Sequence, residues 1–155
     1  MRHASSADDL LLFRAVAEPR RRTIAARLLD GAIGGRAWRR HGEADLWELD
    51  DATGAPDKEP VAVAATRPLG DGRRVKLLGF VVTPALRERG IGQRLLEDLS
   101  DALRGRGVLA LVAAVPSDHA MAIVVVQRAG FRPSHVERAS PDTDGRDVVW
   151  FDVEL

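Results

Sequence analysis

The chain has 155 residues, 45% of them hydrophobic, and its 23 basic side chains balance 23 acidic ones. A chain of this length and apolar content can bury its own core, so we predict one domain over residues 1–155 with a loose tail at 1–9. The zero formal net charge argues against a nucleic-acid-binding protein, which usually carries a basic surface.

Cysteine is absent, which excludes a disulfide framework, a cysteine nucleophile and a thiolate metal site. The four histidines are scattered without the spacing of metal ligands, so we expect no metal. No apolar run approaches the roughly 18 residues of a membrane span, and the N-terminal MRHASSADD turns acidic, unlike a secretory signal. We therefore expect a cytoplasmic protein that does not bind membranes.

The first elements in chain order are a strand over 10–17 and a helix over 19–30, which Gly31 is expected to end. The helix opens with Arg20-Arg21-Arg22 at the positive end of its dipole, which is mildly unfavourable. A solvated helix face and an anionic partner are two interpretations of this run. Residues 32–43 give no clear pattern.

Three strands follow over 46–51, 61–67 and 75–82, separated by TGAPDKEP and PLGDGR. These separators are rich in turn-forming residues and fit hairpins, so the three strands form a meander. On the first strand, Glu48 and Asp50 project to one face, while Trp47 and Leu49 project to the other. Either carboxylate could bind or deprotonate an amine if this face lines a groove, and both are ordinary surface charges if it faces solvent.

The helix that begins at Ile91 is amphipathic, with apolar residues recurring every four positions up to Leu103. Gly90 and Gly92 lack side chains, so the first-turn N–H groups can approach a bound anion such as a pyrophosphate. The unbroken apolar run over 108–115 indicates a strand covered on both faces. Strand, turn, helix and strand together predict one right-handed crossover unit.

Three alternative roles can be considered for these glycines. A Rossmann fingerprint would need a third glycine where Leu95 stands, and its strand should open the domain. The P-loop pattern occurs nowhere in the chain. A short glycine motif can also simply permit a tight turn and close helix packing.

The segment Val81-Val82-Thr83-Pro84, followed by Arg87-Glu88-Arg89-Gly90-Ile91-Gly92, resembles the acyl-CoA-binding motif of the GNAT superfamily of N-acyltransferases. Ala122-Ile123 with Gly130-Phe131 resembles the family's second motif, a short helix that ends in Gly-Phe. The resemblance covers the chain well from about Leu46 onward, and the N-terminal third only by element order.

This resemblance implies an α/β (α+β) GNAT fold: a mixed, mostly antiparallel sheet of about seven strands flanked by about four helices, in the order β-α-α-β-β-β-α-β-α-β-β. It implies acetyl-CoA, or another acyl-CoA, as co-substrate. In the family, the strand before the motif pairs with the pantetheine arm and offers an oxyanion-stabilising amide, and the signature turn binds the pyrophosphate. Carried over to this sequence, the strand residues are Phe80, Val81 and Val82, and the turn residues are Arg87, Arg89, Gly90, Ile91, Gly92 and Gln93.

A second helix is expected over 117–129, then strands over 131–138 and 147–155. Within this helix, MAIVVV at 121–126 is rich in β-branched residues and by itself favours a strand. The family places a helix here, and the helix-start residues at 116–118 and the stop at Gly130 support it.

The same segment departs from the family pattern. The position where many members carry a tyrosine, commonly the acid that protonates the departing thiolate, is Val126, and the usual asparagine is His119. The chain contains no tyrosine. His119 can carry protons at neutral pH or simply cap the helix, and both interpretations stay open. General acid catalysis typically contributes about 10² to 10⁴-fold, so its loss slows such a reaction without abolishing it.

The sequence thus predicts an N-acyltransferase in which a primary amine of a small molecule or peptide attacks the thioester directly. Trp38, Arg39 and Arg40 lie where the family places a substrate-covering element and are candidates for acceptor contact. The missing tyrosine makes a catalytically weak acyl-CoA-binding sensor the main alternative, followed by a nucleotide-binding structural domain. Strand-edge pairing could produce a homodimer.

Overall fold

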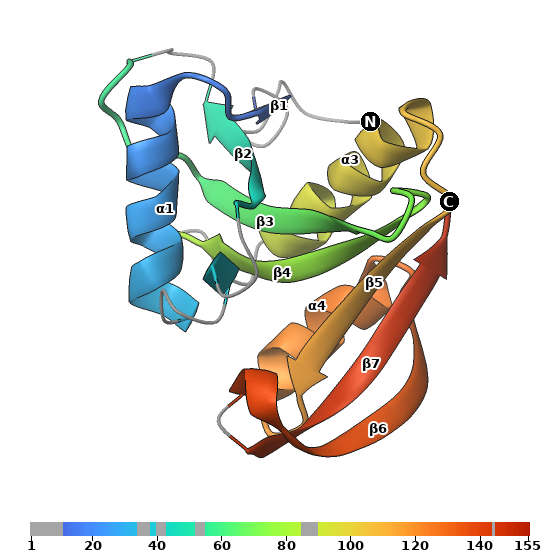
Figure 1. Cartoon of the computed structure of the whole chain (residues 1–155). Helices are drawn as coiled ribbons and strands as arrows, with labels where there is room; N and C mark the ends of the chain where they lie inside the picture. Colours follow the sequence, from blue (N-terminus) through green and yellow to red (C-terminus); the bar gives the residue numbers. More distant parts are fainter. Residues whose placement is uncertain (1–10, 34–37, 40–42, 52–54, 85–89, 144) are drawn as a thin grey trace, which may run out of the picture.

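A computed structural model describes residues 11–33, 38–39, 43–51, 55–84, 90–143 and 145–155 of the chain. Seven strands form one sheet in the order β1-β2-β3-β4-β5-β7-β6 (Figure 1). The strands are β1 Leu11–Ala15, β2 Asp45–Asp51, β3 Ala62–Leu69, β4 Arg74–Val82, β5 Ala110–Pro116, β6 Arg132–Ser140 and β7 Arg146–Glu154. The helices are α1 Pro19–Ile33, α3 Ile91–Gly105 and α4 Ala120–Arg128, with the short 3₁₀ helix η3 at Pro141–Thr143.

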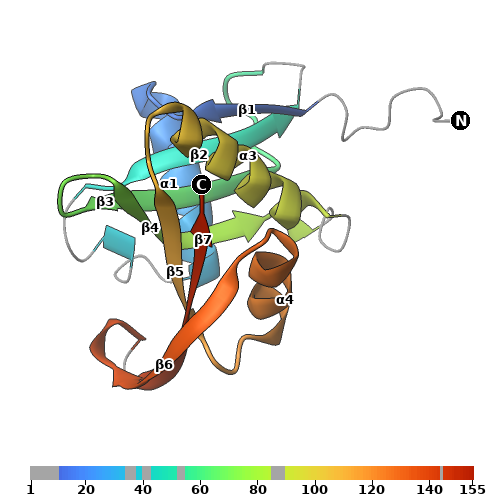
Figure 2. The ribbon, with the colours of Figure 1, turned by 90° about the vertical axis from the view of Figure 1, so that its right-hand side faces the viewer.

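The helices lie on opposite faces of the sheet (Figures 1 and 2). A core cluster on one face joins Leu95, Leu99 and Leu103 of α3 to Leu111 and Phe151 of the strands. A second cluster on the other face joins Ala25 and Leu29 of α1 to Leu46, Val63 and Ala65. We call these the α3 face and the α1 face.

The strand pairing confirms the predicted mixed sheet. All neighbouring strands pair antiparallel except β4 and β5, which are parallel and joined by α3. Parallel neighbours need a crossover connection, which is the unit that the sequence predicted for this stretch.

Two helix boundaries differ from the sequence-based prediction. Helix α1 continues through Gly31 to Ile33, because Gly31 does not adopt the left-handed conformation with which glycine ends helices. Helix α4 begins at Ala120 rather than at residue 117, since His119 is its N-cap. Its MAIVVV segment is helical, so tertiary packing overrides the β propensity of these residues.

The arginine run at the start of α1 is neither a uniformly solvated face nor a free anion-binding patch. Glu18 offsets its charge, because the main-chain N–H groups of Arg20 and Arg21 donate to the Glu18 carboxylate at 3.0 and 3.1 Å. A carboxylate at this end of the helix also interacts favourably with the dipole.

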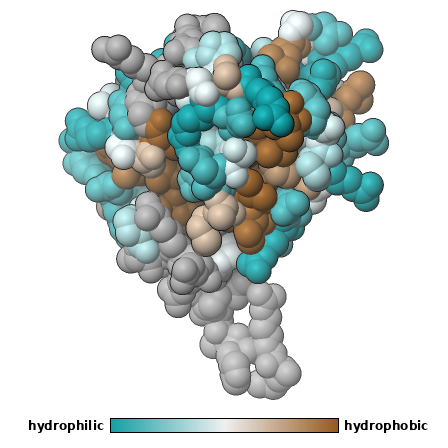
Figure 3. Space-filling view, turned by 90° about the horizontal axis from the view of Figure 1, so that it is seen from below, coloured by the Kyte–Doolittle hydropathy of each residue, from teal (hydrophilic) through white to brown (hydrophobic). Residues whose placement is uncertain are grey.

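Apolar residues are exposed in patches on the face seen from below in Figure 3. Exposed large apolar side chains include Met121 and Val124 of α4 and Val136 of β6. Among the described residues, no helix is both long and apolar enough to cross a membrane.

Candidate functional site

Strand β4 contains a bulge near its middle. Thr66 of β3 is paired with Leu77, whereas the preceding residue Ala65 is paired with Gly79, so Leu78 is an extra residue. An inserted residue bends its strand and disrupts the local ladder. The bulge is the point at which β4 changes direction.

Strands β4 and β5 separate at this bulge. Their parallel pairing runs from Arg74↔Ala110 to Leu77↔Ala113 and goes no further along the described residues. Beyond it, the two strands diverge in Figure 1. Although β4 is a central strand, the residues over 78–81 are only partly buried. A gap in the sheet therefore begins here, and we call it the splay.

Main-chain groups of Phe80 point into the splay. The N–H of Thr83 donates to the Val61 carbonyl of the β3 side at 3.0 Å. Because strand residues alternate in direction, Val81 also faces β3, whereas Phe80 and Val82 direct their main-chain groups toward β5. An edge of this kind can pair with an extended, amide-containing ligand.

The N-terminus of α3 follows β4 and carries the signature glycines. Gly90, its N-cap, has φ of 76° and makes no side-chain capping bond. The first intrahelical bond runs from the Arg94 N–H to the Gly90 carbonyl. The N–H groups of Ile91, Gly92 and Gln93 thus have no partner within the helix, at the positive end of its dipole.

Apolar side chains surround Gly92 closely. A Cβ atom at this position would lie 3.1 Å from Cγ1 of Val125, 3.5 Å from Cγ2 of Val82 and 3.7 Å from Cε2 of Phe80. The first turn of α3, helix α4 and the bent half of β4 therefore meet at a glycine, where any side chain would crowd the junction. Residues Arg87 and Arg89 fall outside the described residues.

On the α1 face, the last residue of α1 packs against the bulge. A Cβ atom on Gly79 would lie 2.2 Å from Cδ1 of Ile33, the last residue of α1. The absence of a side chain at Gly79 lets the helix end approach the bent strand this closely.

Glu48 and Asp50 do project to one face as predicted, while Trp47 and Leu49 join the α3-face core. They are not surface charges, because Glu48 is 0% and Asp50 2% exposed. Arg14 donates to both carboxylates, through Nε to Glu48 at 3.0 Å and through Nη2 to Asp50 at 2.9 Å. The two carboxylates thus lie in a buried ion-pair cluster rather than on an open groove.

Arg21 is the second cation of this cluster. Its Nη2 donates to both Glu48 oxygens at 3.1 Å, and its Nη1 donates to the carbonyls of Pro56 and Lys58. Burial raises the pKa of the Asp50 carboxyl, and the nearby Glu48 adds to this, although the Arg21 and Arg14 guanidinium groups lower it. The arrangement fixes the position of β2 and occupies both carboxylates with protein partners.

His119 caps α4. Its Nδ1 accepts a hydrogen bond from the Ala122 N–H at 3.3 Å, so the capping interpretation of this residue is confirmed. In a neutral imidazole whose Nδ1 is an acceptor, Nε2 carries the proton. The side chain is exposed, whereas Val126, at the expected tyrosine position, is completely buried in the α3-face core.

Trp38 is buried at 4% exposure, and its Nε1 donates to Asp30 at 3.0 Å. Arg39 stacks over the Trp38 ring at 4.6 Å and pairs with Asp30. A groove of about 620 Å³ lies here, and Trp38, Arg39 and Asp30 line it together with Arg22, Thr23, Ala26, Arg27, Glu43, Ala44 and Leu46. Arg40 lies outside the described residues.

The model of the acetyltransferase (GNAT) family matches residues 35–131, which is more than half of the chain. The chain belongs to the acetyltransferase (GNAT) family. The GNAT fold predicted from the sequence is therefore confirmed, with α1, α3 and α4 as its main described helices.

Among curated proteins, the [Ribosomal protein bS18]-alanine N-acetyltransferase of Escherichia coli K12 is 38% identical over 72 residues. The match covers 46% of this chain and 49% of that protein, so the chain spans about half the length of the curated relatives it matches.

Solved GNAT structures extend the likeness to almost the whole chain. The ribosomal-protein-S18-alanine N-acetyltransferase from Escherichia coli superposes with a TM-score of 0.72 at 24% identity, covering 94% of each chain. A GNAT family acetyltransferase from Elizabethkingia anophelis with acetyl-CoA bound superposes with a TM-score of 0.73 at 15% identity, covering 95% of this chain and 99% of that one.

Sequence reasoning missed the two cations that neutralise Glu48 and Asp50. Arg14 stands in an otherwise apolar strand and is directly paired with Glu48 across β1 and β2. A charged residue inside a short apolar strand is a usable signal for such a partner. Arg21 has an arginine on each side in the sequence, so its charge does not stand out from its neighbours and gives no such signal.

Proposed function

We propose that this chain is an N-acyltransferase that moves an acetyl or similar acyl group from acyl-CoA to a primary amine. The observation that carries the proposal is the junction of the open β4 edge with the uncapped first turn of α3. Family membership and a structural neighbour with acetyl-CoA bound support it. The acceptor is a small molecule or a peptide amine.

The two parts of the junction suit the two parts of acyl-CoA. The pantetheine arm is extended and contains amides, so it can pair with main-chain groups of Phe80 along the open edge. The pyrophosphate is an anion and suits the N–H groups of Ile91, Gly92 and Gln93. Arg87 and Arg89 are the cations that the motif adds to this anion site.

The reaction is a direct acyl transfer. The neutral amine attacks the thioester carbonyl, the N–C bond forms, and the C–S bond breaks as CoA leaves. Main-chain N–H groups of the β4 edge stabilise the oxyanion of the tetrahedral intermediate. A thiol with a pKa near 8.5 leaves as a thiolate without obligatory acid assistance. Water can take the proton that the amine nitrogen loses and can supply a proton to the thiolate. Glu48 and Asp50 act structurally here, because the arginines already occupy them.

His119 is the candidate proton donor in its imidazolium form, in which both ring nitrogens are protonated and the hydrogen bond from the Ala122 N–H to Nδ1 is given up. His119→Asn keeps an acceptor for the Ala122 N–H, whereas His119→Ala removes both the cap and the imidazole. If the imidazole donates a proton, both variants lower kcat, and the limb of the pH–rate profile that reports the histidine disappears in each. If His119 only caps the helix, His119→Asn keeps the wild-type kcat and pH profile while His119→Ala loses about 1 kcal/mol of stability.

The experiment that tests the function has two steps. CoA is first titrated calorimetrically, and release of free CoA thiol from acetyl-CoA is then followed across a panel of peptide and small-molecule amines. Binding with turnover on at least one amine is the expected result. Binding without turnover on any amine favours an acyl-CoA sensor, and no binding contradicts both.

A matched pair of variants ties the result to the junction. Gly92→Val adds a branched side chain among Val125, Val82 and Phe80, and it should weaken CoA binding at least about tenfold. Gly31→Ala, which meets no atom within 4 Å, is the control and should bind CoA like the wild type.

A further inference from the structure

Lys76 is a primary amine on the strand that forms one side of the splay. Lys76 and Lys58 are the two lysines of the chain. Val75 and Leu77, on either side of Lys76, belong to the α3-face core. Since neighbouring strand residues alternate, Lys76 projects to the α1 face, opposite α3 and its first turn.

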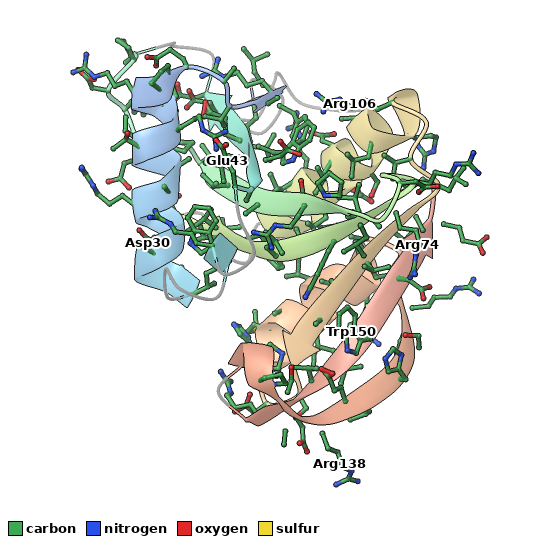
Figure 4. All side chains as sticks on the ribbon, in the orientation of Figure 1. Asp30, Glu43, Arg74, Arg106, Arg138 and Trp150 are labelled. Atoms are coloured by element: carbon green, nitrogen blue, oxygen red, sulfur yellow. The ribbon has the colours of Figure 1, made fainter. Side chains whose placement is uncertain are left out.

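The Lys76 side chain extends from β4 across β5 toward β7. Arg67 is directly opposite Lys76 on β3, and like charges in this position repel each other. On the other side, Lys76 Nζ lies 4.9 Å from the centre of the Trp150 ring. Lys76 therefore spans the β5 strand to reach β7, where Figure 4 labels Trp150.

Trp150 marks the start of the splay on this face. Its partner on β5 is Ala114, and Ala114 is the first residue after the last β4–β5 pair, Leu77↔Ala113. The stacking of His135 on Trp150, with 5.8 Å between ring centres, holds the indole in place. The ammonium group of Lys76 thus lies beside Trp150, over the β5–β7 side of the sheet, at the level where β4 and β5 begin to separate and on the face away from α3.

We propose that Lys76 is a site of self-acylation. The inference rests on the proposed function, in which acyl-CoA lies along the β4 edge and is held by the first turn of α3. An acceptor amine must then approach from the opposite face, and Lys76 Nζ is an amine of this chain already at that face. Held there, it gains the advantage of proximity over an amine free in solution.

The step balances without any further reactant. Lys76 Nζ gives up a proton to solvent and attacks the thioester carbonyl, the N–C bond forms and the C–S bond breaks. CoA leaves as a thiolate and takes up a proton. The product amide carries no charge, so the cation–π contact with Trp150 is lost.

The test is to incubate the full chain with acetyl-CoA and no acceptor, and to quantify acetylation of each lysine by peptide mass spectrometry over time. Lys58, which pairs with Asp51 and is half exposed, reports the non-enzymatic background. We expect acetylation at Lys76 to be at least about tenfold faster than acetylation at Lys58. In the Gly92→Val variant, the rate at Lys76 should fall to the rate at Lys58. Lys76→Arg should leave only the background, and Lys58→Arg should label at Lys76 like the wild type.

Equal rates at the two lysines, or labelling of Lys76 that Gly92→Val does not reduce, would overturn the inference. The proposed function is judged separately, by CoA titration and thiol release with external amines. If CoA binds and external amines turn over while Lys76 stays at background, only the self-acylation proposal fails. If CoA does not bind, both fail.

Discussion

At the residue level, the guanidinium group of Arg21 joins three parts of the N-terminal half. It contacts Glu48 on β2 and the carbonyls of Pro56 and Lys58 in the loop that leads to β3, while its own main chain begins α1. With 7% of its surface exposed, it is a buried cation whose charge is compensated inside the protein. A buried pair of this kind contributes little net stability, but losing one partner is costly.

Glu48→Gln should therefore destabilise the fold by about 2 to 4 kcal/mol, because it leaves Arg21 buried with less compensation. Asp57→Asn is the matched control: Asp57 also pairs with an arginine of α1, Arg20, but both side chains are more than half exposed. That change should cost less than about 0.5 kcal/mol. Urea unfolding measures the free energy of unfolding of both variants. Equal losses of stability in the two variants would contradict the role assigned to the buried cluster.

Asp50 makes the stability depend on pH in a defined direction. Because burial raises its pKa above the usual 3.8, the folded state holds this proton more tightly than the unfolded state. The resulting stabilisation is fully present below pH 3.8 and is lost as the pH rises through the raised pKa. Asp50→Asn cannot titrate, so its stability relative to the wild type should rise with pH across this window. Urea unfolding from about pH 4 to 7 tests this, and a difference that falls with pH would contradict it.

At the level of elements, helix α1 runs past its predicted stop. Gly31 does not terminate the helix, and Ile33 two residues later packs on Gly79 at the β4 bulge. This contact joins residues 46 positions apart in the sequence, so local sequence does not encode it.

Gly31→Ala should stabilise the chain by about 0.5 to 1 kcal/mol. The position is helical and exposed, a Cβ atom there meets nothing within 4 Å, and alanine restricts the unfolded chain more than glycine. Thermal or urea unfolding measures the gain. A loss of stability would mean that the last turn of α1 is not helical as described.

The elements that sequence predicted best are those with a strong period. Helix α3 begins at Ile91 as its apolar spacing indicated, and the apolar run near 108–115 forms β5. The start of α4 was harder because histidine is not among the usual capping residues, although the His119 cap is a local contact. The bulge in β4 was harder because the extra Leu78 depends on pairing with β3. Gly79 inside a strand was the available local hint of a bulge.

At the level of the whole molecule, one sheet is built from two parts that pair only partially. Strands β1 to β4 carry α1, strands β5, β7 and β6 lie beside α4, and the parts join over four residue pairs from Arg74↔Ala110 to Leu77↔Ala113. The splay begins beyond these pairs, in the middle of the sheet. Under the proposed function, the pantetheine arm of acyl-CoA pairs with the β4 main chain there.

The sequence predicted the architecture and the start of α3 at the signature glycines, because glycine spacing and strand order are local signals. The role of these main-chain groups in CoA binding stays a prediction. It did not predict the state of Glu48 and Asp50, since burial and pairing with Arg14 and Arg21 depend on residues 27 or more positions away. Side-chain chemistry at the acceptor face depends on the same kind of long-range contact.

The most direct measurement is residue-resolved amide hydrogen exchange by NMR, with and without saturating CoA. The account predicts slower exchange at Phe80 and at Ile91, Gly92 and Gln93 when CoA is bound, because these main-chain N–H groups become hydrogen-bonded to the ligand. Strands β1 and β2 should be unaffected. Unchanged exchange at all four residues under saturation, or protection confined to the groove beside Trp38, would contradict the account.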